Sequence, residues 1–339
     1  MRSFGSDNHS GIHPDILTAI AHANVDHAPS YGTDDWSERA QDLFKSEFGE
    51  KSETFFVFNG TAANVTAIRS LMRTFESVIC SDVSHLNMDE CAAPEFFTGG
   101  KLNLIPHVHG KISLETVQAS LIRRGDQHFA QARVLSLTQP TELGTCYDLA
   151  EVRDFANWAH AQGLYLHIDG ARLANAAHYL GVSFRELITE TGVDVVSFGG
   201  TKNGLMFGEA VVFLRPELAK DYKYVRKQSA QLPSKTRFNA AQFEAYFQNG
   251  LWKKIAAHSH EMALSLRREL EKIPRVEITA PSHSNAVFAL IPQPWVKRLR
   301  EKYFFYVWNE KTFECRLMTS WDTTPADIQG FTSLLRELS

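Results

Sequence analysis

Residues 197–204 read SFGGTKNG and place Lys202 in a turn between glycines. An apolar run, residues 193–198, leads into this turn and another, residues 209–214, follows it, so both are expected to be buried strands. A lysine at the end of a buried strand can lose its hydration, which disfavours the ammonium form and leaves an amine able to attack a carbonyl. An isolated lysine is more often a surface residue of a hairpin, so the interpretation depends on the rest of the chain.

Asp169 ends a second apolar run, residues 164–168, 33 positions before Lys202. An acid and a lysine at two strand ends suit pyridoxal phosphate. The lysine forms a Schiff base with the cofactor, and the acid keeps the pyridine nitrogen protonated so that the ring withdraws electrons. Either residue alone is a weak signal, but together, in this order, they predict a pyridoxal-phosphate enzyme.

Short apolar runs alternate with amphipathic segments from residue 55 onward. Strands are expected at residues 55–58, 77–80, 101–105, 132–137, near 164, near 193 and near 209, and helices at 60–72, partly at 85–97, at 113–124, at 148–162 and from 171. This alternation indicates an α/β fold whose mostly parallel sheet is covered by helices on both faces. Ligands of such sheets bind beyond the carboxyl ends of the strands, where Asp169 and Lys202 fall.

The pattern changes after Pro233. Residues 238–273 are expected to be mainly helical with a break at 249–250, and short strands and helices then continue to a last helix at 325–338. We therefore predict an N-terminal arm and large domain over residues 1–240 and a smaller C-terminal α+β domain over residues 241–339. The polar arm, residues 1–30, is expected to be a frayed terminus or a segment docked on a neighbouring subunit.

Composition excludes several classes of protein. The chain is 44% hydrophobic and 22% charged, with a net charge of −4, which gives no reason to expect nucleic acid or an anionic membrane as a partner. The first residues lack the apolar core of a signal peptide, and no run approaches the roughly 20 apolar residues of a membrane span, so a cytoplasmic protein with reduced cysteines is expected. The pairs His9/His13 and His258/His260 lack a third ligand, so we expect no metal site.

Residues 59–64, NGTAAN, lie between an expected strand and an expected helix. Free backbone N–H groups at a helix N-terminus bind anions, and Gly60 would let a phosphate approach closely. An ordinary helix capped by Asn59 or Thr61 is the alternative. The shared strand-end location with Asp169 and Lys202 favours the phosphate site.

Two histidines are candidates for the same site. His85 follows an expected strand by a few residues and could stack on the cofactor ring or shuttle a proton. It could equally cap a helix or be buried and hydrogen-bonded. His128 precedes the strand at residue 132 and is a weaker candidate by itself.

Three arginines are candidates for binding an anion. Arg172 comes three residues after Asp169, and Arg316 lies inside an otherwise apolar strand, where an arginine is costly unless its planar fork meets an anion such as a carboxylate. An internal salt bridge is the alternative for both. Arg237 could equally be a surface charge.

These segments together resemble the L-threonine aldolase and phenylserine aldolase family of pyridoxal-phosphate enzymes, which has the aspartate aminotransferase-like fold (fold type I). The resemblance covers essentially the whole chain. It rests on an ordered set of segments: residues 6–8, 31–34, 59–64, 84–91, 169–172, 197–204 and 316–320.

The resemblance implies a role for each candidate residue. Lys202 would hold the cofactor, Asp169 would pair with its pyridine nitrogen, and His85 would stack on its ring. Gly60 and Thr61 would bind the phosphate; Ser6, Arg172 and Arg316 would hold the substrate carboxylate; His85 and His128 would lie near the substrate hydroxyl; and Arg237 would reach a neighbouring subunit's site. Shared sites of this kind imply a homodimer or homotetramer.

The chain departs from the commoner aldolase pattern in two places. It has GTKN around Lys202 where many relatives have Ser-Lys-Gly, and residues 137–144 read LTQPTELG instead of the Glu-Asn-Thr-His type. Both variants resemble the phenylserine aldolase branch and leave the substrate side chain open.

The predicted reaction is retro-aldol cleavage of a β-hydroxy-α-amino acid, namely L-threonine, L-allo-threonine or L-phenylserine, to glycine and an aldehyde. The base would be His85, His128 or a water between them. The alternatives are β-elimination or transamination on the same fold, a metal-dependent hydrolase, and a cofactor-binding protein without catalytic activity.

Overall fold

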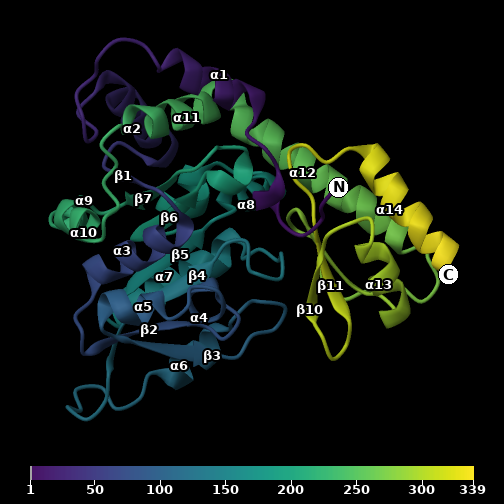
Figure 1. Ribbon diagram of the computed structural model, residues 1–339. Helices are drawn as coiled ribbons and strands as arrows, with labels where there is room; N and C mark the ends of the chain where they lie inside the picture. Colours follow the sequence, from purple (N-terminus) through teal and green to yellow (C-terminus); the bar gives the residue numbers. More distant parts are fainter. Residues whose placement is uncertain (1) are drawn as a thin grey trace.

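The computed structural model describes residues 2–339 and is built around a seven-stranded sheet (Figure 1). The strands lie in the order β1 (Glu53–Val57), β7 (Glu209–Phe213), β6 (Val195–Gly199), β5 (Tyr165–Gly170), β4 (Gln131–Thr138), β2 (Glu76–Ser81) and β3 (Lys101–Ile105). Strand β7 is antiparallel to both of its neighbours, and the remaining neighbouring pairs are parallel. The mostly parallel sheet predicted from the sequence is confirmed.

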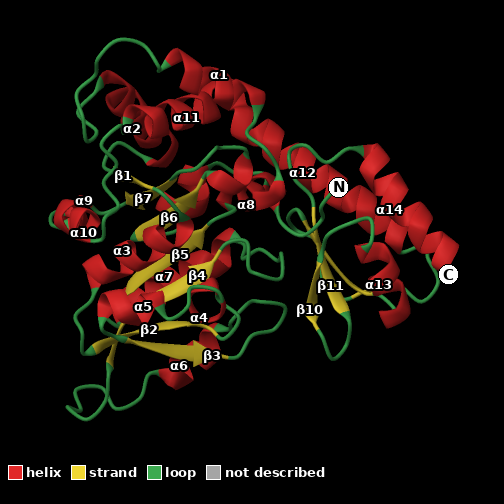
Figure 2. Ribbon diagram, in the orientation of Figure 1, coloured by secondary structure: helices red, strands yellow, loops and turns green. Residues whose placement is uncertain are grey.

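Helices cover both faces of this sheet, also as predicted (Figure 2). The first face packs against α2 (Asp35–Phe48), α7 (Leu149–Ala161), α8 (Leu173–Leu180) and α11 (Arg237–Phe247), and the second against α3 (Gly60–Leu71) and α10 (Tyr222–Gln228). Side chains along a strand alternate between faces, so Phe198 joins the first cluster and Val195 the second. Phe44 of α2 packs edge-on against Phe198, with ring centroids 5.5 Å apart, and so anchors α2 over the strand that leads to Lys202.

A smaller antiparallel sheet lies beside the large one, in the order β10 (Tyr306–Asn309), β11 (Glu314–Met318), β9 (Ala286–Leu290) and β8 (Glu277–Ile278). Helices α12 (Leu251–Leu270), α13 (Gln293–Arg300) and α14 (Pro325–Leu338) pack with it around a separate apolar cluster. The beginning of α12 belongs to the large cluster and its end to the small one. The predicted domain boundary at residue 240 stays a prediction.

Strand β10 was missed in the sequence. It is a four-residue strand at the edge of the small sheet, with both ends exposed, so it carries almost no apolar alternation. Helix α6 (Leu114–Ser120) is shorter than the predicted helix at 113–124, because the backbone of Leu121 leaves the helical conformation, with ψ at 74°, and Arg123 then adopts a positive φ. The other helices of four or more residues are α1 (Pro14–His22), α4 (His85–Met88), α5 (Ala93–Thr98), the π-helical turn Arg185–Thr189 and α9 (Pro216–Ala219).

The first described residues of the N-terminal arm do not form the frayed terminus that was one expectation, because they dock on their own chain; docking on a neighbouring subunit stays a prediction. Phe4 is 1% exposed, and its backbone N–H and carbonyl bond Phe304 and Met318. The arm is polar on average, but this single aromatic side chain packs against Tyr303 and Phe331 of the small domain. Docking places Ser6 and Asp7 beside the carboxyl edge of the large sheet.

No helix within residues 2–339 is both long enough and apolar enough to cross a membrane.

Candidate active site

Four of the predicted site residues meet at the carboxyl edge of the large sheet. Gly60 follows β1, His85 follows β2, Asp169 lies near the end of β5, and Lys202 follows β6. Together with six other residues they line one small cavity of about 40 Å³. Parallel strands bring their carboxyl ends to the same edge, and this geometry unites residues up to 142 positions apart in sequence, from Gly60 to Lys202.

Asp169 is buried and held as an anion. Its Oδ2 accepts a hydrogen bond from Asn64 Nδ2 at 2.8 Å, and its Oδ1 accepts one from the backbone N–H of Ala171 at 3.1 Å. Burial by itself would raise the pKa of this carboxyl, but the positive charges of His85 and Lys202 and the bond from Asn64 outweigh it and lower the pKa. The carboxylate is therefore available to a cationic partner in the cavity.

Lys202 lies in the short turn Thr201–Asn203, directly after β6. Glycine is required before it, because a Cβ on Gly199 would overlap the backbone of Ala171. Glu209 Oε2 accepts the backbone N–H of Gly200 at 3.0 Å and holds the turn in place. Burial, and then repulsion by Arg172, lower the pKa of Lys202, which favours the neutral amine.

His85 begins α4 and is tied into a hydrogen-bond network under the cavity. Its Nδ1 lies 2.7 Å from Glu90 Oε1, which also accepts a bond from Asn64 Nδ2 at 2.9 Å. Burial opposes charge on the ring, but the bond with Glu90 and the charge of Asp169 raise the pKa of His85 above its ordinary value. One ring nitrogen of His85 and one carboxylate oxygen each of Glu90 and Asp169 lie within 4.8 Å of one another. The side-chain amide of Asn64 donates to both carboxylates.

The N-terminus of α3 is both capped and open toward the cavity. Asn59 Oδ1 accepts the backbone N–H of Ala62 at 2.9 Å, as the capped-helix alternative expected. Within residues 2–339, however, the N–H groups of Gly60 and Thr61 have no acceptor. A Cβ on Gly60 would meet no atom within 4 Å. Two free donors thus lie at the start of α3, and Gly60 lines the small cavity, an arrangement that suits an anion.

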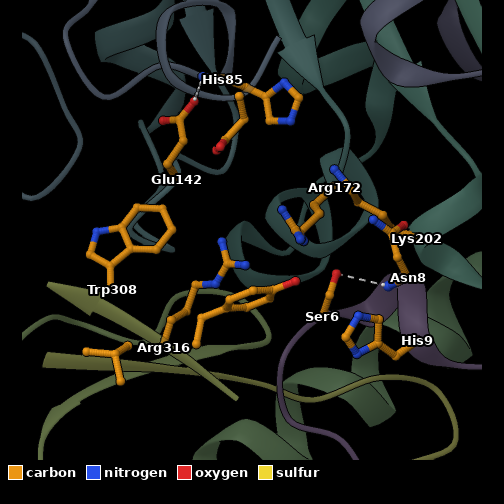
Figure 3. Close-up of a pocket in the computed structure, with 12 residues that line it drawn as sticks. Ser6, Asn8, His9, His85, Glu142, Arg172, Lys202, Trp308 and Arg316 are labelled. Carbon is orange, nitrogen blue, oxygen red and sulfur yellow. Dashed lines mark hydrogen bonds between the residues drawn. The ribbon is translucent and has the colours of Figure 1, made fainter. Parts of the chain in front are cut away.

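A larger cavity of about 390 Å³ adjoins the first, and His85, Glu142, Arg172 and Lys202 line both (Figure 3). Arg172 Nε and Nη2 donate to the buried carboxylate of Asp7 at 2.6 and 2.8 Å. The internal salt bridge that the sequence left open is therefore present at Arg172. Only its Nη1 remains without a bond among the described residues.

Arg316 of β11 lines the large cavity with Ser6 (Figure 3). Its guanidinium lies 4.8 Å from the ring centroid of Trp308 and 5.5 Å from that of Tyr306, and its Nε is buried without a partner. No carboxylate within residues 2–339 pairs with it, so the salt-bridge alternative is absent here. Burial, and then repulsion by Arg172, lower the pKa of Arg316 to about 10.

The structure does not bring His128 and Arg237 to this site. His128 is exposed in the loop before β4, at the amino edge of the sheet, which is opposite the edge that carries Lys202. In sequence it directly precedes β4, and the start of a parallel strand lies at the amino edge of the sheet. Arg237, at the start of α11, donates to the carbonyl of Val25 at 2.8 Å and lies over the rings of Trp36 and Phe238.

Four residues near these cavities were missed in the sequence: Asp7, Asn64, Glu90 and Glu142. Asn64 and Glu90 are fully buried and connect His85 to Asp169. Both lie in segments that carry the resemblance, residues 59–64 and 84–91, but the sequence assigned neither of them a role. Glu142 had a signal, because it lies in the segment 137–144 where the chain departs from its relatives' commoner pattern.

Comparison with known proteins agrees with this arrangement. Residues 3–293 match the model of the beta-eliminating lyase family. The low specificity L-threonine aldolase of Pseudomonas aeruginosa is 41% identical over 99% of this chain and 97% of its own length, and that of a Pseudomonas strain is 40% identical over the same shares. The chain belongs to the beta-eliminating lyase family.

The structure supports the same placement. A threonine aldolase of Leishmania major matches it with a TM-score of 0.94 and 29% identity, covering 100% of this chain and 99% of the other. The resemblance to L-threonine aldolases and the fold-type-I architecture predicted from the sequence are thereby confirmed, as is the class of enzyme, a lyase. The alternative of a metal-dependent hydrolase is a different class of enzyme from the lyases that the chain matches.

Proposed function

We propose that this lyase uses pyridoxal phosphate to cleave β-hydroxy-α-amino acids, among them L-threonine, L-allo-threonine and L-phenylserine, into glycine and an aldehyde. The observation that carries the proposal is the small cavity lined by Lys202, whose pKa is lowered, by the Asp169 carboxylate and by Gly60, at the helix start where two N–H groups have no acceptor among the described residues. The names of the relatives support the aldol reaction over β-elimination and transamination.

The described residues fit pyridoxal phosphate group by group. Lys202 offers an amine to the aldehyde, Asp169 offers an anion to the pyridine nitrogen, and His85 offers a ring to stack on. The backbone donors of Gly60 and Thr61 offer a phosphate site at the start of α3. When bound, the cofactor supplies an electron sink for the pair left on Cα when the Cα–Cβ bond breaks.

The larger cavity provides the substrate site. We assign the α-carboxylate to Arg316, with Ser6 and the free Nη1 of Arg172 beside it. Asp7 holds Arg172 in a fixed orientation, so the carboxylate is positioned by a rigid cation and not by a flexible one. The rings of Tyr306 and Trp308 form a wall of the same cavity, which suits an aromatic substrate side chain such as that of phenylserine.

The role of Arg237 in a neighbouring subunit's site, and the oligomer that this role requires, are also proposals. Because Arg237 lies away from its own chain's cavities, a role in the site would require a second subunit, and we propose a homodimer or homotetramer with shared sites. An active monomer that persists on dilution in sedimentation would contradict this. The cytoplasmic location also stays a prediction.

The function is tested on the purified protein incubated with pyridoxal phosphate and L-allo-threonine. We expect visible absorbance from the bound cofactor and equal amounts of glycine and acetaldehyde in the same tube. Release of a keto acid and ammonia would show β-elimination, and conversion of the amino acid without an aldehyde would show transamination. A protein that binds no cofactor would sink the proposal as a whole.

Replacing Arg316 by lysine is expected to raise KM for the amino acid about 10- to 100-fold while the cofactor stays bound. Lysine keeps the charge but loses the planar fork, and a hydrogen bond to a charged group contributes about 1.5–3 kcal/mol. The measurement is steady-state kinetics beside cofactor content, with the exposed Arg298→Lys of α13 as a matched control. An unchanged KM would mean that Arg316 does not bind the carboxylate.

A further inference from the structure

Glu142 is a carboxyl group in the site to which no role has been assigned. It lies in the loop after β4 and lines both cavities, the small one with Asp169 and the large one with Arg316. Figure 3 shows it beside His85, on the same side of the large cavity. A residue shared by the two cavities lies where the substrate would meet the cofactor.

The hydrogen bonds of Glu142 are unequal. Its Oε1 accepts the backbone N–H of His85 and the hydroxyl of Thr138, both at 2.8 Å. Its Oε2 is buried and has no partner among the described residues. The carboxyl is thus held in place through one oxygen, while the other can take up a proton without breaking a hydrogen bond.

The burial of Glu142 changes its pKa. Burial raises the pKa of Glu142 to about 7, although the bonds from Thr138 and His85 oppose the shift. The negative charge of Asp169 contributes to this raised pKa. A group that titrates near neutral pH can both accept and return a proton during turnover.

The other titratable groups near Glu142 suit a proton-transfer role less well. The charged and titratable groups around it are His85, Asp89, Asp169, Arg172, Lys202 and Arg316, with the neutral Cys80 and Tyr147 behind them. His85 has a raised pKa and bonds Glu90 through Nδ1, which favours its protonated form. Asp169 has a lowered pKa and is a weak base.

We propose that Glu142 is the acid–base residue of this site and that its carboxylate takes the β-hydroxyl proton of the substrate. The inference rests on the proposed aldol cleavage. The hydroxyl proton passes to Glu142, the O–H electron pair forms the C=O bond of the aldehyde, and the Cα–Cβ pair stays with Cα. Cα then takes one proton from solvent to give glycine, and Glu142 returns its proton to solvent, so the reaction balances.

The first test compares Glu142→Gln and Glu142→Asp with the unaltered protein over pH 5–9. In the unaltered protein, kcat/KM should rise with pH through about 7, because only the carboxylate accepts the proton. Glu142→Gln keeps an oxygen acceptor for His85 and Thr138 but should lower kcat/KM about 100-fold or more and abolish that rise. Glu142→Asp should restore the rise with part of the rate.

Glu90→Gln is the matched control, because Glu90 is also a buried carboxyl bonded to His85 but lines neither cavity. It should leave the rise of kcat/KM near pH 7 in place. If Glu90→Gln abolishes the rise and Glu142→Gln does not, His85 is the acid–base group and the proposal is overturned.

A second readout uses the protein without cofactor and needs no turnover. The folded-state pKa of Glu142 lies above its unfolded value, so its contribution favours the fold below the unfolded pKa and is lost as pH rises toward about 7. Glutamine does not titrate. The unfolding temperature of Glu142→Gln relative to the unaltered protein should therefore increase from pH 5 to pH 8.

The remaining outcomes separate other roles. A uniform loss of unfolding temperature at every pH, together with lost activity, would show a structural residue and overturn the proposal. A changed pH dependence of the cofactor's absorbance in Glu142→Gln would show action on the cofactor and overturn it as well. If the unaltered protein releases no glycine and aldehyde, the proposed function itself fails.

Thr138→Val keeps the proposal falsifiable if Glu142→Gln does not fold. It removes one hydrogen bond to Oε1 and leaves the carboxyl group in place. Because that bond opposes the raised pKa, the rise of kcat/KM should move to higher pH. A rise that does not move would overturn the proposal.

Discussion

Replacing Lys202 by alanine is expected to abolish both turnover and the visible absorbance of covalently held cofactor. Lys202 is the sole lysine lining either cavity among residues 2–339, so no second amine can substitute. The fold should survive, since the substitution removes a group whose charged form is destabilised by burial. Absorbance, cofactor content and glycine release measure the result.

The control for this substitution is Lys297→Ala, which removes an exposed lysine of α13. It should keep the absorbance and the rate of the unaltered protein. Retention of covalent cofactor and turnover in Lys202→Ala would remove the central claim about the site. Loss of both in a protein with an unchanged unfolding temperature would support it.

Replacing Asp169 by alanine is expected to leave cofactor bound but to lower kcat about 10²- to 10³-fold, the range found when one electrostatic partner of a reacting charge is removed. The carboxylate would no longer keep the pyridine nitrogen protonated. Its loss also removes a negative charge that raises the pKa values of Lys202 and His85. Kinetics and cofactor content, measured on the same preparation, check the prediction.

Asp169→Asn separates the charge from the packing. Asparagine has nearly the same shape but carries no charge, and its single carbonyl oxygen can accept only one of the two bonds, from Asn64 or from Ala171, that the two carboxylate oxygens of Asp169 accept. We expect it to be as slow as Asp169→Ala and closer to the unaltered protein in unfolding temperature. A normal rate in either variant would mean that Asp169 does not sustain the electron sink.

The site residues that could be predicted are those that lie at the carboxyl ends of parallel strands. Lys202, Asp169, His85 and Gly60 each follow or end an expected strand, and parallel pairing places such residues at one edge without further information. The resemblance assigned His128 a role near the substrate hydroxyl, but the structure places it before β4, at the opposite edge of the sheet. Glu142, by contrast, comes after β4 and lines both cavities.

The sequence by itself determined the alternation of strands and helices, the sheet they form, and the pairing of a lysine with an acid at its edge. These follow from local sequence patterns, namely continuous apolar runs for the buried strands and apolar periodicity for the helices. Tertiary structure alone decided that Arg172 pairs with Asp7, 165 positions away, while Arg316 pairs with no carboxylate of the described residues: its Nε is buried without a partner, and its Nη2 donates to the carbonyl of Gly5 at 3.4 Å. It also decided that Glu142 keeps one oxygen unbonded, because hydrogen bonds between distant segments depend on docking and leave no periodic pattern in the chain.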